Sequence, residues 1–318
     1  MIEGIPRISV GVITYKQEKI VSRALDSLLA QKDYIYEICV SDDCSPDNTW
    51  QVLLDYQGRY PDFIKLRRNE RNVGIFENIE LRRTMLTGDI VYTLAGDDEA
   101  GKDWFKSVVE YIINNKIDYK NKRVCFYGNT KVVYPNGDEF IRNNCLIKKH
   151  PYDSLSLVMR GAVNAAGCCY SAGMIELFEN VSRGRSYAVE EIQDRQLQLN
   201  TDVAYYIPTV CNVYYANIGV SVGMNASEKE GRRDIFIDAY NYFKDKQALK
   251  ERDGYYYLYK DAQVRYLLDR TFNNYIDVLR YRLKSFVLKY DFNPASIKRV
   301  LFAVLRRMPH KKPLRMNL

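Results

Sequence analysis

The most informative stretch of this chain is Ile90-Val91-Tyr92-Thr93-Leu94-Ala95-Gly96-Asp97-Asp98. Its first six residues form a mostly apolar run of the length of a buried strand, and two adjacent carboxylates follow after one glycine. In open α/β sheets, ligands bind in the crevice outside the carboxyl ends of the strands. Adjacent acids repel each other and are costly to bury unless a cation or a ribose offsets them. The stretch therefore predicts a ligand site at a strand end, although two solvated acids in a polar turn would produce the same pattern.

Strands and helices alternate in the sequence that precedes this stretch. Residues 8–13 and 36–41 are short apolar runs typical of strands, and residues 20–29 repeat apolar side chains at helical spacing. A second helix is expected after Pro46, and a third covers residues 75–86. The order β-α-β-α-β-α-β predicts an α/β protein with a doubly wound, mostly parallel sheet.

Several short motifs on these elements carry a resemblance to a known family. They are Val12-Ile13-Thr14-Tyr15, Ala24-Leu25-Asp26-Ser27-Leu28-Leu29-Ala30-Gln31, Ser41-Asp42-Asp43-Cys44-Ser45-Pro46-Asp47-Asn48-Thr49, Asn72-Val73-Gly74, Gly88-Asp89-Ile90-Val91 and Asp97-Asp98. With these motifs in this order on strands and turns, residues 1–220 resemble the family-2 glycosyltransferases of the GT-A fold. The resemblance implies transfer of a sugar from a nucleotide diphosphate donor, expected to be a UDP-sugar, to a hydroxyl with inversion of the anomeric centre.

The acidic pair is the candidate site for a divalent cation. The leaving nucleoside diphosphate gains negative charge as the glycosidic bond breaks, and Mg²⁺ or Mn²⁺ on its phosphates would stabilise that charge. We assign Asp98 to the metal and Asp97 to the ribose or a metal-bound water. Many members of the family carry a further acid two positions before Asp97, where this chain has Ala95. Whether Glu99 compensates for it is left open.

Four residues are expected to contact the nucleotide. The resemblance places Asp43 beside a uracil-like base, where a carboxylate accepts a hydrogen bond from an imino N–H; helix N-terminal charge is the alternative role. Tyr15 is expected to flank or stack on the base, or else to pack at the sheet edge. Asn72 and Gly74 would let the backbone approach the donor, unless they form an ordinary turn.

The general base is expected in the second half of the chain. Relatives carry a Glu-Asp pair at a helix start with the base second, and the pair here is Glu190-Glu191, so we assign Glu191. The alternative is a pair of acids stabilised by the helix dipole. The region around Tyr215 has no His where relatives often have one, so no His ligand is expected there. The two His of the chain, His150 and His310, lie in no motif, which argues against zinc sites and His-based triads.

Composition predicts two regions in the chain and argues against nucleic acid as a partner. Residues 1–222 are predicted to form the nucleotide-sugar-binding and catalytic domain, and residues 223–318 a helical, basic region. Within that region, residues 297–307 form a basic amphipathic pattern that predicts contact with a membrane surface or packing on the catalytic domain. The net charge of +7 is too small for a nucleic-acid binder, and no apolar run reaches the ~20 residues of a membrane span.

Seven irregularly spaced Cys and the lack of a signal-peptide pattern favour a cytoplasmic protein, peripheral at the inner face of the membrane. The expected acceptor is a saccharide or a lipid-linked saccharide of surface glycan synthesis. Two alternative functions remain. A nucleotidyltransferase would usually have a Gly-rich loop after its first strand, which Thr14-Tyr15-Lys16-Gln17 lacks. A non-catalytic sugar-nucleotide-binding module is suggested by Ala95 but opposed by Glu190-Glu191.

Overall fold

A computed structural model describes residues 5–144, 151, 167–177, 197, 200–216, 258, 262 and 271–287. The chain forms two compact units, Met1–Gly219 and Val220–Leu318. Functional roles for residues 1–222 and 223–318 stay predictions.

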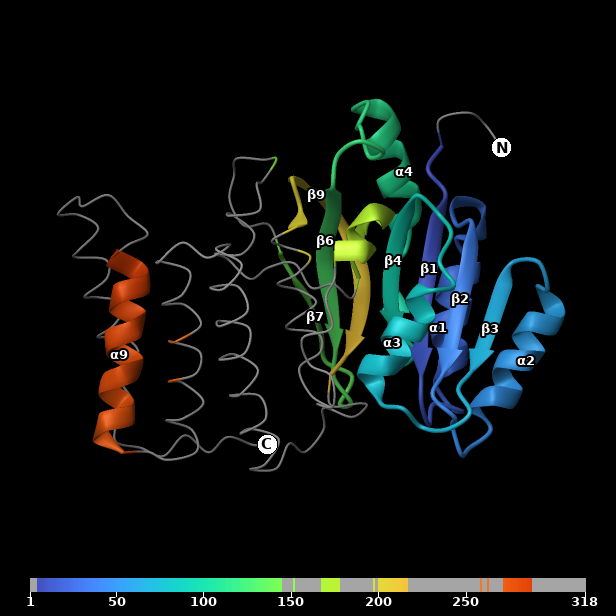
Figure 1. Ribbon diagram of the computed structural model, residues 1–318, viewed down its shortest axis with the longest axis horizontal. Coiled ribbons are helices and arrows are strands. Elements are labelled where there is room, and N and C mark those ends of the chain that lie inside the picture. The colour runs from blue at the N-terminus through green and yellow to red at the C-terminus, as the bar shows by residue number, and fades with distance from the viewer. Residues whose placement is uncertain are drawn as a thin grey trace. The chain divides into compact units, whose positions relative to one another are not determined.

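The first unit is built on one sheet with helices on both faces (Figure 1). Its strands are β1 (Ile8–Thr14), β2 (Glu37–Asp42), β3 (Ile64–Arg68), β4 (Ile90–Ala95), β5 (Glu99–Ala100), β6 (Val124–Val133), β7 (Glu139–Arg142), β8 (Cys169–Ser171) and β9 (Val203–Tyr215). Its described helices are α1 (Val21–Leu29), α2 (Thr49–Arg59), α3 (Ile75–Arg83) and α4 (Trp104–Asn114), with the short 3₁₀ helices η1 (Lys32–Tyr34) and η2 (Ala172–Leu177). The strand order is β3-β2-β1-β4-β8-β6-β9-β5, and β7 pairs with β6.

The N-terminal half of the sheet is parallel. Strand β1 pairs in parallel with β2 and β4, and β2 pairs in parallel with β3. The arrowheads of these strands therefore point the same way in Figure 1. In the other half, β8 runs antiparallel to β4 and β6, β6 and β9 are parallel, and β5 is antiparallel to β9. These pairings confirm the expected α/β fold with a mostly parallel sheet.

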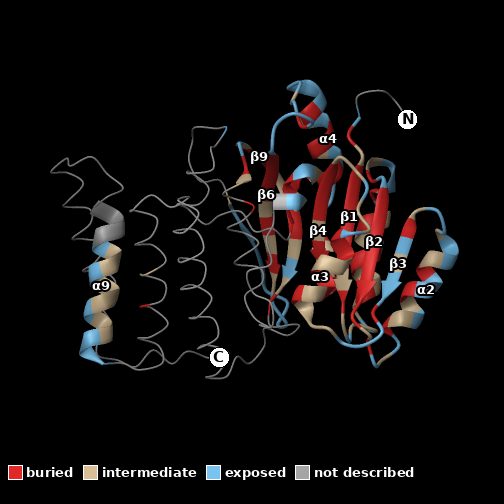
Figure 2. Cartoon of the chain, in the orientation of Figure 1, coloured by how far each residue is buried: buried red, intermediate tan, exposed pale blue. Residues whose placement is uncertain are grey.

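The two faces of the parallel half differ in polarity. Val10, Val12 and the alternating apolar residues of β2 and β4 form the main core with α1, α2 and α4. Figure 2 shows the burial concentrated in these central strands. The opposite face, under α3, carries Ser9, Gly11 and Ser41, and it binds α3 mainly through polar side chains.

Helix α3 buries polar groups next to its apolar residues Phe76 and Ile79. Asn78 is hydrogen-bonded to Ser41 through both its amide oxygen and its amide nitrogen, at 2.6 and 3.1 Å. Arg82 lies across Gly11 and donates to its carbonyl oxygen at 3.0 Å. Burial lowers the pKa of Arg82 to about 10. A β-carbon on Gly11 would lie 2.6 Å from Arg82 Nη1, so a larger residue at this strand position would force the buried Arg82 side chain to move.

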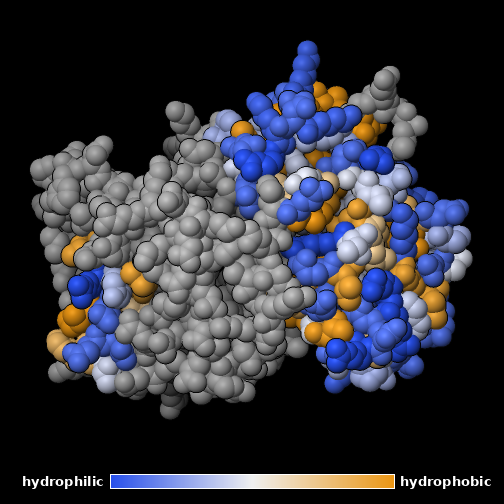
Figure 3. Space-filling model, in the orientation of Figure 1, coloured by the Kyte–Doolittle hydropathy of each residue, from blue (hydrophilic) through white to orange (hydrophobic). Residues whose placement is uncertain are grey.

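The second unit is described mainly at α9 (Phe272–Val287). Phe272, Ile276 and Leu283 are exposed on this helix, and Figure 3 shows the hydropathy of the described surface. None of the helices in the described ranges has the length and apolar character needed to cross a membrane. The basic pattern at residues 297–307 lies outside the described residues.

Candidate functional site

The candidate site lies where the parallel strands end. Thr14 is in register with Asp42, Asp42 with Arg68, and Ile13 with Ala95. The turns that follow these strands therefore meet at one edge of the sheet. This edge carries Asp42-Asp43 after β2 and Asp97-Asp98 after β4.

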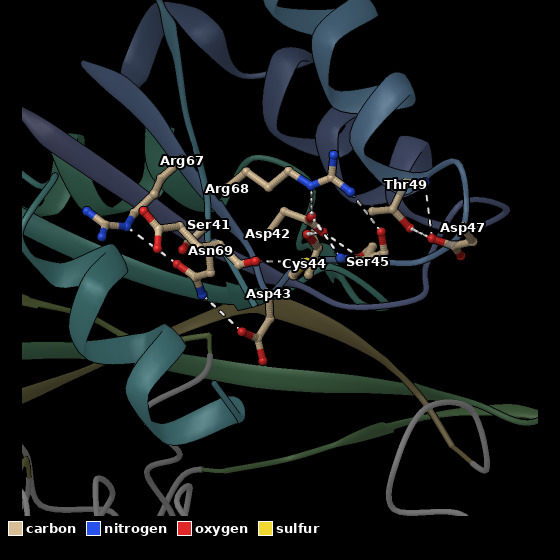
Figure 4. A network of polar contacts seen from close by, with 12 residues as sticks. Ser41, Asp42, Asp43, Cys44, Ser45, Asp47, Thr49, Arg67, Arg68 and Asn69 are labelled. Atoms are coloured by element: carbon tan, nitrogen blue, oxygen red, sulfur yellow. Dashed lines mark hydrogen bonds and ion pairs between the residues drawn. The ribbon is translucent and has the colours of Figure 1, made fainter. Parts of the chain in front are cut away.

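Asp42 stabilises the turn that leads into α2. Its carboxylate is fully buried, and it accepts hydrogen bonds from Thr14 Oγ1 at 3.1 Å and from the backbone N–H of Ser45 at 3.0 Å. Arg68 Nε lies 3.5 Å from Asp42 Oδ2. Figure 4 shows Asp42 enclosed by Ser45 and Arg68. These contacts give Asp42 a structural role within the protein.

Asp43 connects the end of β2 to the turn before α3. Its Oδ1 accepts hydrogen bonds from Asn69 Nδ2 at 3.0 Å and from the Val73 N–H at 2.8 Å, and its Oδ2 accepts one from the Gly74 N–H at 2.9 Å. The Asn69 contact is visible in Figure 4. A carboxylate oxygen has about two acceptor positions, so Oδ2 can accept one more donor from a ligand. The Asp43 N–H also bonds the Thr14 carbonyl at 3.0 Å, which places Asp43 beside Tyr15.

The turn that Asp43 holds depends on a glycine. Gly74 has φ +89° and ψ 158°, a conformation that is available almost only to glycine. Apart from its chain neighbours, no atom of the described residues lies within 4 Å of where its β-carbon would be, so the described part of the turn is open on that side. Asn72 is exposed and Tyr15 is half-buried at the same edge. The structure thus groups Tyr15, Asp43, Asn72 and Gly74, while their contacts with a nucleotide stay predictions.

The second acidic pair lies across β1 from Asp43. The Gly96 N–H bonds the Ile13 carbonyl at 3.0 Å and attaches the Asp97-Asp98 turn to the end of β1. Burial raises the pKa of the Asp97 carboxyl, and the charge of Arg23 opposes this rise only in part. Asp98 is buried, and its Oδ1 accepts a hydrogen bond from the Tyr215 N–H at 3.1 Å.

Glu99 has partners within the protein. Its Oε1 lies 3.2 Å from Arg23 Nε and accepts a hydrogen bond from the Tyr215 hydroxyl. Burial, followed by this hydrogen bond, raises the pKa of Tyr215 to about 12. Arg23 and Tyr215 were not among the predicted site residues. In the sequence, Arg23 looks like any polar residue on an amphipathic helix. Tyr215 was considered only because the region around it lacks the His that relatives often have.

The carboxylates at this edge are compatible with a divalent cation that is shared with a ligand. Among the described residues, no group of three or more His, Cys, Asp or Glu side chains could hold a metal alone. With Glu99 paired to Arg23 and Tyr215, the Asp97-Asp98 pair remains. Mg²⁺ commonly binds one or two carboxylates and completes its shell with waters and substrate phosphates. Asp97 and Asp98 suit that arrangement. Glu191 lies outside the described residues.

The matches to known proteins include the part of the chain that contains both acidic turns. The model of glycosyl transferase family 2 matches residues 9–175. An uncharacterized protein of Mycobacterium tuberculosis is 26% identical over 135 residues, which cover 41% of this chain and 37% of that protein. The dTDP-rhamnosyl transferase RfbG of Shigella flexneri is 25% identical over 165 residues, covering 49% of this chain and 52% of RfbG. The matches thus span about a third to a half of these relatives.

Solved structures show the same fold. The crystal structure of Staphylococcus aureus TarS residues 1–349 with UDP-GlcNAc has a TM-score of 0.58 at 17% identity, covering 90% of this chain and 94% of that chain. The structure of GalNAc-T7 with UDP, GalNAc and Mn²⁺ has a TM-score of 0.53 at 12% identity, covering 96% of this chain and 59% of that chain. At these identities the likeness concerns the fold alone.

Proposed function

This chain belongs to glycosyl transferase family 2, and on that premise we propose that it is an inverting, metal-dependent glycosyltransferase. It would move a sugar from a nucleoside diphosphate donor, expected to be a UDP-sugar, to a hydroxyl of a saccharide or lipid-linked acceptor in surface glycan synthesis. One observation carries the proposal: two acidic turns, at Asp43 and at Asp97-Asp98, flank the end of β1 in the matched region.

The proposed roles follow from the chemistry of each group. Asp43 Oδ2 would accept the imino N–H of a pyrimidine base, with Tyr15 beside the ring and the open turn at Asn72 and Gly74 next to the donor. Asp97 would accept hydrogen bonds from the ribose or a metal-bound water. The name of RfbG includes dTDP, and that of the TarS complex includes UDP-GlcNAc. Thymine and uracil, the bases of these nucleotides, both carry an imino N–H.

The transfer step needs a base and stabilisation of the leaving group. Glu191 would take the proton of the acceptor hydroxyl as its oxygen forms the new bond to the anomeric carbon. The bond to the diphosphate oxygen breaks on the opposite face, and both of its electrons leave with the nucleoside diphosphate. Mg²⁺ or Mn²⁺ would supply electrostatic stabilisation of that leaving group, and Asp98 would hold the ion.

Turnover of sugar nucleotides by the 318-residue chain tests the proposal. We expect release of UDP from a UDP-sugar in the presence of Mn²⁺ and none with excess chelator. UDP binding without any turnover, with a panel of donors and acceptors, would favour the non-catalytic binding module. Release of pyrophosphate from a nucleoside triphosphate and a sugar phosphate would favour the nucleotidyltransferase instead.

A membrane-associated acceptor is part of the proposal. Its support is the basic amphipathic pattern of residues 297–307, which is typical of helices that lie on anionic membrane surfaces. The enzyme would then act at the inner face of the membrane.

A further inference from the structure

Arg23, Glu99 and Tyr215 form a cluster directly beside the acidic pair. They come from α1, β5 and the end of β9, so three distant parts of the sequence meet here. The Arg23 guanidinium carbon lies 3.4 Å from the centre of the Tyr215 ring. Glu99 contacts both partners, by an ion pair to Arg23 and by a hydrogen bond from the Tyr215 hydroxyl. Each member therefore contacts the other two.

The cluster also contacts both acids of the adjacent turn. The Tyr215 N–H donates to Asp98 Oδ1 at 3.1 Å, and Arg23 Nη2 donates to the Asp97 carbonyl oxygen at 2.6 Å. Strand pairing of Glu99 with Val213 places Tyr215 opposite the turn. The side chain of Asp98 and the backbone of Asp97 are thus held by Tyr215 and Arg23, and both of these residues contact Glu99.

The charges within the cluster favour cation binding at the turn. Glu99 forms an ion pair with Arg23, and the same guanidinium donates a hydrogen bond to the Asp97 carbonyl oxygen. The positive charge of Arg23 is thus partly balanced by Glu99, next to a turn that carries two carboxylates. Side chains that orient metal-binding carboxylates are needed for full metal affinity, although they do not touch the metal.

We infer that Arg23 and Tyr215 are positioning residues that orient the Asp97-Asp98 turn for a divalent cation held with a nucleoside diphosphate. This inference rests on the proposed function. Tyr215 acts through its hydroxyl bond to Glu99 and its N–H bond to Asp98, and Arg23 acts through its stacking on Tyr215 and its bond to the Asp97 carbonyl.

Tyr215→Phe is the sharpest test because it removes one oxygen and no charge. We would titrate the 318-residue chain with UDP calorimetrically at a series of Mn²⁺ concentrations and determine the Mn²⁺ concentration that gives half-maximal binding. Loss of an outer-shell partner typically weakens metal affinity about 10–100-fold, and we expect about a tenfold rise in the half-saturating Mn²⁺ concentration. Arg23→Lys keeps the positive charge but loses the planar guanidinium group. It should raise the half-saturating Mn²⁺ concentration at least as much.

The chain offers a matched control at α2. The Tyr56 hydroxyl donates to Asp26 at 2.7 Å, and Arg59 lies 4.1 Å from its ring centre. Tyr56→Phe and Arg59→Lys therefore make the same chemical changes in a similar cluster outside the acidic turn. We expect both variants to keep the Mn²⁺ dependence of the wild type, even if their thermal stability falls.

The outcomes separate this inference from the proposed function. If the wild type does not bind UDP with Mn²⁺, both are overturned. Suppose the wild type binds UDP with Mn²⁺, but the half-saturating Mn²⁺ concentration of Tyr215→Phe stays within twofold of the wild-type value. Then only the positioning role is overturned. The same holds if Tyr56→Phe raises that concentration as much as Tyr215→Phe does. Should Arg23→Lys fail to fold, Tyr215→Phe decides alone.

Discussion

Replacing Asp43 with Asn tests the link between the fold and the nucleotide site. The carboxylate accepts three hydrogen bonds, from Asn69, Val73 and Gly74. An asparagine can keep its carbonyl oxygen at the Oδ1 position, but its NH₂ group would then face the Gly74 N–H. One bond to a charged acceptor is lost, and the part-buried Gly74 N–H loses its protein partner.

The expected cost can be worked out from these contacts. A hydrogen bond to a charged group contributes about 1.5–3 kcal/mol to folding, so the free energy of unfolding should fall by about that amount. For a domain of this size the midpoint temperature should drop by about 3–12 °C. If Asp43 also accepts the imino N–H of the base, UDP affinity should fall about 10–150-fold.

Two separate measurements check the two effects. Both Trp residues, Trp50 and Trp104, lie in the first unit, so intrinsic fluorescence during heating reports the unfolding of that unit. Calorimetric titration with UDP and Mn²⁺ measures the affinity. Asp62→Asn, at an exposed position, makes the same change in net charge and should alter neither quantity. Unchanged stability of Asp43→Asn would refute its role in the turn, and unchanged affinity would refute its contact with the base.

Four other variants extend these expectations. Asp98→Ala should abolish Mn²⁺-dependent UDP binding in a protein that still folds, with a melting midpoint lowered by loss of the hydrogen bond from the Tyr215 N–H; unchanged affinity in calorimetry would exclude Asp98 as the metal ligand. Glu191→Gln should keep donor affinity but lose about 10²–10⁴-fold in kcat, because an amide cannot accept the acceptor proton; if Glu190→Gln is the inactive variant instead, the base is the other member of the pair. Gly11→Ala should destabilise the first unit by about 1–3 kcal/mol, because the new methyl group collides with Arg82, whereas Gly58→Ala in α2, with no atom within 4 Å, should be neutral or stabilising in the same melt. Truncation after Pro294 should release the protein from anionic vesicles without loss of UDP binding, and failure of the intact chain to bind such vesicles at low salt would leave residues 297–307 as a packing element.

The parallel half of the fold could be predicted because its signals are local. Apolar runs of strand length, an amphipathic first helix and glycines at turns determine β1, β2, β4 and α1 almost independently of the rest. The predicted order includes a strand between the second and third helices, but the residues of this strand, β3, were not identified from sequence because Ile64–Arg68 are largely charged. As an edge strand it pairs only with β2 among the described strands, and charged residues there discourage association with other sheets.

The packing of α3 shows why a hydrophobic pattern does not reveal every interface. Its buried residues include Asn78, Arg82 and Arg83 as well as Phe76 and Ile79. A polar helix face normally lies against solvent. Here it lies against the sheet, where Ser41 and the Gly11 carbonyl form hydrogen bonds with its side chains. Those partners become visible only when strands that are distant in sequence are placed next to each other.

The acidic turn at Asp97-Asp98 illustrates the same limit at the site itself. From sequence, Ala95 raised the question of whether Glu99 supplies the missing third acid. In the structure the Glu99 carboxylate is engaged by Arg23 and Tyr215, so its charge balances a cation within the protein. A metal at this turn would then depend on the two remaining carboxylates and on the phosphates of its ligand. Metal and nucleotide should consequently bind together: Mn²⁺ affinity measured without UDP should be much weaker than with UDP. A tight Mn²⁺ site in the free protein would require a further ligand that this arrangement does not supply.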